Sequence, residues 1–134
     1  MSEEDCPEAV AKVARKFAGK GRIERILKSR RKRRAAFHVE IALNNRLERS
    51  LQISEDGKLL SQVDRIRESE LPVTVKNAVT GFLEEGARFD GADFVRTSES
   101  EEFHVELDLG DDLDLHLFLD EDGALLRQHE VGDF

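Results

Sequence analysis

The chain has 134 residues, of which 39% are hydrophobic and 37% charged, a balance typical of a globular protein and not of a disordered one. It has no Trp and no Tyr, so its eight Phe must supply the aromatic part of any core. No apolar run approaches the roughly 18 residues of a membrane-spanning helix, and the acidic start lacks the apolar segment of a signal peptide, so we expect neither feature.

The net charge of −8 is divided unevenly along the chain. Residues 1–66 carry 16 Lys and Arg against 10 Asp and Glu, a net of +6, whereas residues 67–134 carry 5 against 19, a net of −14. Such an asymmetry concerns partners and association more than fold. Self-association through the oppositely charged halves is therefore one hypothesis.

The first predicted element is an amphipathic helix that opens at Pro7. Proline suits the first turn of a helix because its missing N–H would be unpaired there anyway. Cys6, the single cysteine, excludes an internal disulfide and is interpreted as a small buried group at the helix start. Apolar residues then follow the spacing i, i+3, i+4, i+7 that marks a buried helix face, at Val10, Val13, Ala14 and Phe17.

Strands are predicted after this helix, the first over Arg22–Lys28. Asn44-Asn45-Arg46 and Asp56-Gly57 supply turns between later strands, because Asn and Gly tolerate a positive φ. A short charged linker, Arg65–Glu70, then leads to a second helix that opens at Pro72. Its apolar stripe has the same spacing as the first, at Val75, Ala78, Val79 and Phe82.

The second helix is followed by a strand over Ala92–Thr97 and by two segments of alternating apolar and polar residues, Phe103–Leu109 and Leu113–Leu119. Strict alternation is typical of strands with one buried face. Gly110-Asp111-Asp112 and Asp122-Gly123 are the predicted turns.

The two halves of the chain resemble each other. At an offset of 66, 13 of the 26 positions from 37 to 62 are identical, and the helix stripes match at an offset of 65. This repeat predicts an α+β fold of two tandem modules, residues 1–66 and 67–134, each a helix over a four-stranded antiparallel sheet. Joining of the sheets edge to edge, with the helices on one face, remains open as a variant.

Two segments resemble the PepSY-like family, which is also described as β-lactamase-inhibitor-like. They are a helix opened by Leu-Pro, at Leu71-Pro72-Val73, and an apolar–acidic–Asp-Gly turn, at Phe118–Leu126 and again at Ile53–Leu59. The resemblance implies tandem modules that bind a protein or peptide on the open sheet face, with no catalytic residues and no cofactor. It also implies export, whereas the chain as given shows no signal peptide.

Alternation assigns a common set of side chains to the open face of the predicted sheet, namely His38, Glu40, Gln52, His104, Glu106, Asp108, His116 and Phe118. Phe118 is the one large apolar group there and is the expected anchor for a ligand. A symmetric turn at 110–112 would place Glu106 opposite His116 and His104 opposite Phe118. His104, Glu106 and His116 could then hold a metal ion. We favour an ordinary charge pair and predict no metal, because a flat sheet face rarely converges ligands.

A basic run forms the other candidate site, at Lys28, Arg30, Arg31, Lys32, Arg33 and Arg34. It could bind an anionic surface or nucleic acid, but the chain is acidic and has no Trp or Tyr for base stacking. In the repeat it falls at a hairpin tip. No motif sets up a nucleophile or cradles a phosphate, so we predict a non-enzymatic binding or inhibitory module.

Overall fold

The structure is a computed structural model that describes residues 3–31, 34–43 and 47–132. Contacts divide the chain into two compact units, Met1–Asp64 with Arg96–Ser98, and Arg65–Val95 with Glu99–Phe134. Each unit has its own helix and its own hydrophobic core. None of the described helices combines the length and apolar character needed to cross a membrane.

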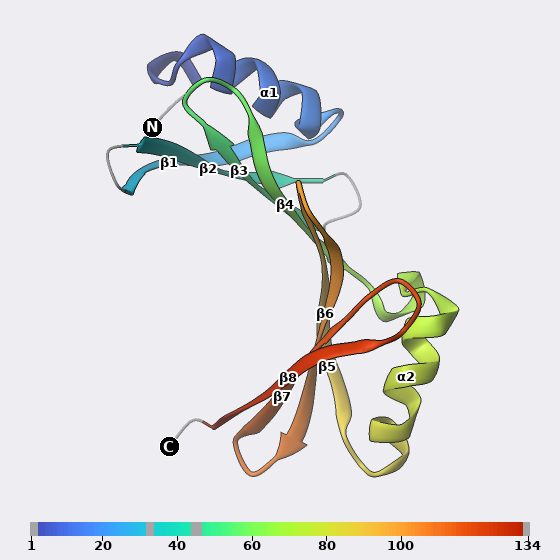
Figure 1. Cartoon of the computed structure of the whole chain (residues 1–134). Helices are drawn as coiled ribbons and strands as arrows, with labels where there is room; N and C mark the ends of the chain where they lie inside the picture. The colour runs from blue at the N-terminus through green and yellow to red at the C-terminus, as the bar shows by residue number, and fades with distance from the viewer. Residues whose placement is uncertain (1–2, 32–33, 44–46, 133–134) are drawn as a thin grey trace. The chain divides into compact units, whose positions relative to one another are not determined.

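The first unit places one helix across a set of strands. After the short 3-10 helix η1 (Glu3–Asp5), α1 spans Glu8–Ala18 with Pro7 at its N-cap, as predicted. α1 lies against β1, β2 and β3 (Figure 1), and Val10 and Ala14 on its buried face are fully inaccessible. The strands of this unit are β1 (Arg22–Arg31), β2 (Arg34–Ala42), β3 (Glu48–Ser54) and β4 (Leu59–Ile66).

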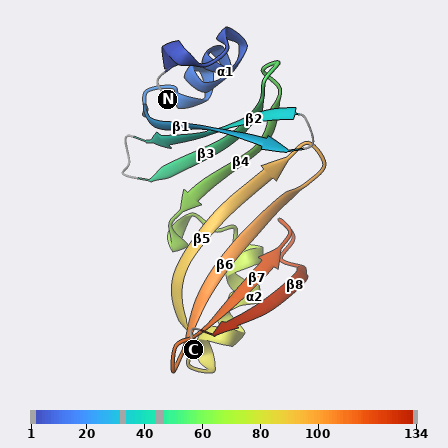
Figure 2. The same cartoon turned by 90° about the vertical axis from the view of Figure 1, so that its left-hand side faces the viewer.

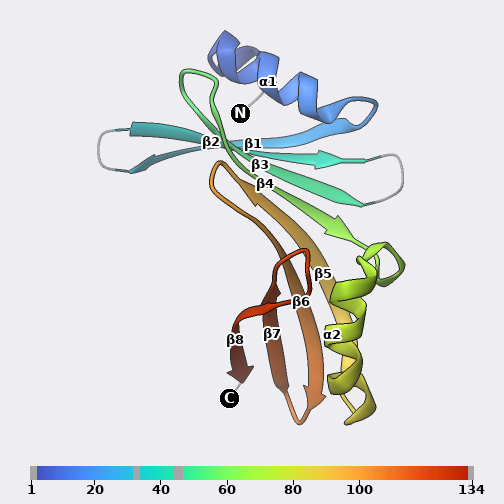
Figure 3. The same cartoon turned by 45° about the vertical axis from the view of Figure 1, so that its right-hand side comes forward.

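The second unit follows the same order of elements. The 3-10 helix η2 (Glu68–Glu70) takes up half of the predicted linker, whose first two residues belong to β4, and α2 spans Val73–Glu84 behind Pro72. Val75 and Val79 of α2 are buried in a core with residues of β5, β6 and β7. Within the described part of this unit, no element covers the other side of β6 and β7 (Figures 1 and 3). The strands are β5 (Arg88–Thr97), β6 (Glu101–Gly110), β7 (Leu113–Leu119) and β8 (Leu125–Gly132), seen in Figure 2.

The division of the strands into two separate four-stranded modules is wrong. Among the described residues the strands form a single eight-stranded sheet, ordered from β1 to β8 along the chain. Two separate sheets would leave four edges with unpaired N–H and C=O groups, whereas one sheet leaves two. Alternation in sequence reports which face of a strand is buried, but it does not report which strands pair.

The Asp-Gly turns have a second role that the sequence did not suggest. Gly57 and Gly123 have φ of 88° and 83°, which confirms the predicted turns. A Cβ on Gly123 would lie 2.4 Å from the carbonyl oxygen of Thr74 in α2. Thr74 Oγ1 also donates a hydrogen bond to the carbonyl of Glu121, at 2.6 Å. The turn therefore packs directly on the first turn of α2, and in the same way a Cβ added to Gly57 would lie 3.0 Å from Ala9 of α1.

Two further turns are predicted from the sequence, at 110–112 and at 44–46. Gly110, Asp111 and Asp112 all have positive φ, of 86°, 53° and 61°, which confirms the turn between β6 and β7. The turn predicted at 44–46 lies outside the described residues. Two strands are longer than predicted, because β1 continues to Arg31 and β5 begins at Arg88.

Candidate functional site on the open sheet face

The open face of each unit carries the predicted polar side chains. All eight are half-buried, and they alternate with buried apolar neighbours, as His104 and Glu106 do with Val105 on β6, except that Asp108 is followed by the exposed Leu109. In the second unit His104 pairs with Phe118 and Glu106 with His116, which confirms the predicted register. On the side of β6 and β7 that carries no helix in the described part of the unit, these four side chains therefore lie next to one another.

A histidine–phenylalanine cluster forms around Phe118 on this face. The ring of His104 stacks on Phe118, with centroids 4.5 Å apart and planes 5° from parallel. The Arg127 guanidinium lies 4.4 Å from the Phe118 centroid, within cation–π range. His129 meets the same ring edge-on at 5.9 Å, and His116 completes the cluster by stacking on His104 at 5.0 Å.

A β-bulge brings Arg127 and His129 into the cluster. Leu119 pairs with Leu125, but the next pair is Phe118 with Arg127, so Leu126 is an extra residue in β8. A regular ladder would have placed Leu126 beside Phe118, because a slip of one residue exchanges the two faces of a strand. Neither residue could be predicted at the site from the sequence, since alternation alone gives no sign of the bulge.

Two arginine–carboxylate pairs hold the cluster in place. Arg127 donates to both oxygens of Glu102, at 2.8 Å from Nη2 and 3.3 Å from Nη1. This bidentate geometry fixes the plane of the guanidinium near Phe118. Arg65 lies 3.4 Å from Asp93 Oδ2, and the same Asp93 oxygen lies 3.8 Å from His104 Nδ1. The sequence analysis named none of these four residues as site residues.

His104 has a pKa that burial and neighbouring charges displace. Its Nε2 lies 2.8 Å from Nδ1 of His116, a hydrogen bond that requires one neutral ring as acceptor. Burial lowers the pKa of His104, and the nearby His116 and Arg65 lower it further, while Glu106 and Asp93 act in the opposite direction. The net lowering keeps His104 neutral near pH 7.

The lowered pKa of His104 predicts an acid-sensitive fold. The unfolded chain binds a proton at His104 near the ordinary pKa of about 6.5, whereas the folded chain binds it only at lower pH. The free energy of unfolding should therefore fall as pH decreases below that value, and the loss should be complete below the folded pKa. Urea denaturation at a series of pH values measures this, and His104→Gln should flatten the profile. A wild-type profile that is already flat in this range would contradict the assignment.

The open face of the first unit lacks the cluster. His38 Nδ1 lies 2.7 Å from Gln52 Nε2, and His38 Nε2 lies 3.4 Å from Glu40. Gln52 and Ser50 occupy the positions that correspond, 66 residues earlier, to Phe118 and His116. As far as the described residues of this unit show, its open face is therefore a hydrogen-bonded polar surface without an aromatic anchor.

Two further predicted candidates lie apart from the cluster. Asp108 Oδ1 accepts a hydrogen bond from the backbone of Gly110 at 2.8 Å, so it belongs to the turn. In the basic run, Lys32 and Arg33 lie outside the described residues, Arg31 pairs in register with Arg34, and Lys28 and Arg30 are exposed on β1. Lys28 Nζ also lies 6.0 Å from the ring of Phe37.

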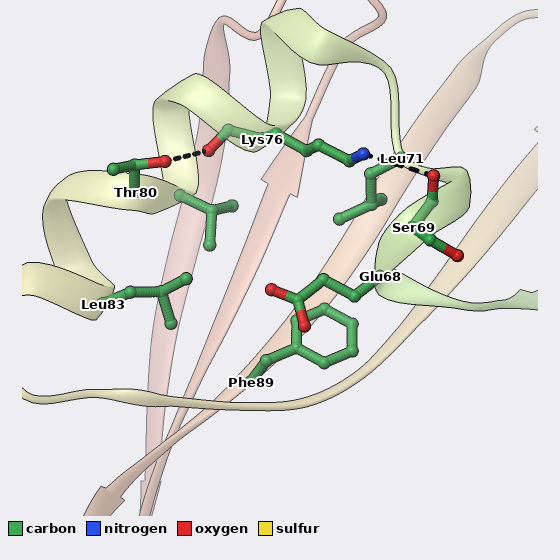
Figure 4. Close-up of a pocket in the computed structure, with 8 residues that line it drawn as sticks. Glu68, Ser69, Leu71, Lys76, Thr80, Leu83 and Phe89 are labelled. Carbon is green, nitrogen blue, oxygen red and sulfur yellow. Dashed lines mark hydrogen bonds between the residues drawn. The ribbon is translucent and has the colours of Figure 1, made fainter.

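A hollow of about 390 Å³ lies on the helix side of the second unit. Leu71, Leu83 and Phe89 face it, while Lys76 Nζ turns to the carbonyl of Ser69 at 3.2 Å (Figure 4). Thr80 Oγ1 likewise bonds within α2, to the carbonyl of Lys76 at 2.8 Å. The polar groups that Figure 4 joins by dashed lines are therefore directed at the backbone, whereas the carboxylate of Glu68 points into the hollow beside Phe89.

Solved structures of the same fold come from Bacteroides. A DUF2874 family protein from Bacteroides ovatus is 18% identical, with a TM-score of 0.74 over 96% of this chain and 89% of that chain. A BLIP-like protein from Bacteroides fragilis is 16% identical, with a TM-score of 0.73 and the same coverage. The chain has the fold of these proteins.

A third structure of this fold, from Bacteroides eggerthii, is described provisionally as periplasmic. It is 16% identical, with a TM-score of 0.74 over 93% of this chain and 88% of that chain. No family model matches the sequence. No curated protein matches it either.

Proposed function

We propose that the chain is a non-enzymatic module, PepSY-like in its tandem organisation, that binds a protein or peptide on the open face of its second unit. The observation that carries the proposal is the grouping of half-buried Phe118 with His104 and Arg127 on a sheet face that none of the described helices covers. Phenylalanine and arginine are both enriched at protein interfaces relative to the rest of the surface. Without a partner, a half-buried Phe on a sheet face leaves part of its apolar ring in water and contributes less to stability than a Phe in the core.

Two further features support a protein partner. The fold shared with a BLIP-like protein is consistent with binding or inhibition of another protein. The bidentate Glu102 pair holds Arg127 beside the ring before any partner arrives, which reduces the entropy that binding must offset. Export of the chain is part of the proposal, and the neighbour described provisionally as periplasmic supports it.

Affinity capture from the source organism with matched baits tests the proposal. The wild-type chain, Phe118→Ala and Gln52→Ala would each be immobilised, because Gln52 is the residue 66 positions before Phe118. We expect one protein to be retained by the wild type and by Gln52→Ala, and lost with Phe118→Ala. Truncating an anchor costs about 2 kcal/mol or more, or roughly thirtyfold in affinity. Equal retention by all three baits would show that the open face of the second unit is not the binding surface.

A further inference from the structure

Two imidazole rings and a carboxylate converge on the open face of the second unit. Single ligand atoms of His104, Glu106 and His116 all lie within 4.8 Å of one another. We propose that these three residues bind one divalent transition-metal ion of the zinc class. Two imidazoles and one carboxylate, with a fourth position left to water, form a known ligand set for zinc.

The distance between the two histidine nitrogens fits such an ion after a small side-chain movement. Zn–N distances of about 2.0–2.1 Å and tetrahedral angles place two nitrogen ligands about 3.3 Å apart. His104 Nε2 and His116 Nδ1 are 2.8 Å apart and face each other across neighbouring strands. Separation by about half an ångström is within reach of a side-chain rotation, so the ladder between β6 and β7 can stay unchanged.

Asp93 lies close to the position of the outer partner that zinc-binding histidines usually have. A histidine ligand normally directs its second ring nitrogen at a carboxylate, which fixes the tautomer and the ring orientation. Asp93 Oδ2 lies 3.8 Å from His104 Nδ1, within ion-pair range, and Arg65 Nη1 lies 3.4 Å from the same oxygen. A proton on Nδ1 leaves Nε2, the atom that faces His116, free to coordinate. Asp93 is thus a positioning residue.

The first unit provides an internal comparison. His38 and Glu40 correspond to His104 and Glu106, but Ser50 stands where the second unit has His116. In addition, His38 Nδ1 is already hydrogen-bonded to Gln52 at 2.7 Å. The proposal therefore requires one ion per chain, bound only in the second unit.

Calorimetric titration of the whole chain with Zn²⁺ alone tests the proposal at near-neutral pH. We expect one saturable site in the wild type and an unchanged site in His38→Gln. Asp93→Asn should weaken binding by about tenfold to a hundredfold, the usual effect of removing an outer carboxylate. His104→Gln and His116→Gln should each weaken it further still. Circular dichroism of every variant checks that the sheet is retained.

A measurement on the wild type keeps the test independent of variant folding. Zn²⁺ should shift the ring NMR resonances of His104 and His116 and leave those of His38 in place. The absence of saturable binding up to about millimolar Zn²⁺, the range of weak association, would overturn the proposal. Binding that persists in both histidine variants would overturn it as well. Since no protein partner takes part, neither outcome bears on the role of Phe118.

Discussion

Leu117→Ala should lower the free energy of unfolding by about 2–5 kcal/mol, while Phe118→Ala should lower it by only about 0.5–1.5 kcal/mol. The two residues are adjacent on β7 but point to opposite faces. Leu117 is fully buried in the core under α2, so its truncation leaves a cavity that the close-packed surroundings cannot fill. Phe118 is half-exposed and loses mainly its contacts with His104 and Arg127.

Urea denaturation of the whole chain measures both losses. Leu51→Ala is the matched variant in the first unit, because Leu51 lies 66 residues before Leu117 and is equally buried. Leu51→Ala should lower the free energy of unfolding by an amount similar to that for Leu117→Ala. Equal losses for Leu117→Ala and Phe118→Ala would mean that both faces of β7 are covered, and the open face would then be no surface for a partner.

Gly123→Ala should lower the free energy of unfolding by about 3 kcal/mol or more, clearly beyond the loss of about 1–2 kcal/mol expected for Gly110→Ala. Both glycines have a positive φ, of 83° and 86°, so both variants carry the backbone cost of a side chain in that region. Only Gly123 has an obstacle, since an added Cβ would lie 2.4 Å from the carbonyl oxygen of Thr74. Nothing lies within 4 Å of a Cβ on Gly110.

The difference between the two glycine variants isolates the contact between the turn and α2. Thermal unfolding of both variants, alongside the wild type, measures it. Relief of the clash would have to move the turn off the helix, which also breaks the bond from Thr74 Oγ1 to Glu121. Equal destabilisation by the two variants would indicate that the turn does not pack on α2.

Local periodicity accounts for the elements that could be predicted from the sequence. Stripes such as Val75 and Val79 identify the buried helix faces, and alternation through Val105 and Leu117 identifies the buried strand faces. The turn at 110–112 fixed the pairing of Glu106 with His116, because a closed turn sets the register of a hairpin. These features depend on neighbours in the chain, which a sequence displays directly.

Features that depend on distant pairing could not be predicted. The bulge at Leu126 reverses which residues of β8 point to each face of the sheet and places Arg127 beside Phe118. No residue type in the sequence marks the position of this bulge. A matching shift occurs in the first unit, where Leu60 is the extra residue between pairs Ile53–Leu59 and Gln52–Ser61. The contact of Asp93 with His104 joins β5 to β6. The order of strands in the single sheet also depends on pairing between distant parts of the chain, so it could not be predicted either.

The most direct test of binding on the open face of the second unit is photo-crosslinking. The chain would be crosslinked, from defined positions, to the partner protein that affinity capture retains. The photoreactive residue p-benzoylphenylalanine would replace His129 in one chain and Val63 in another. These positions are 66 residues apart, and they pair in register with His116 and Ser50 on the two open faces. We predict crosslinks to the partner from position 129 and none from position 63. Crosslinks from position 63 alone would contradict the account.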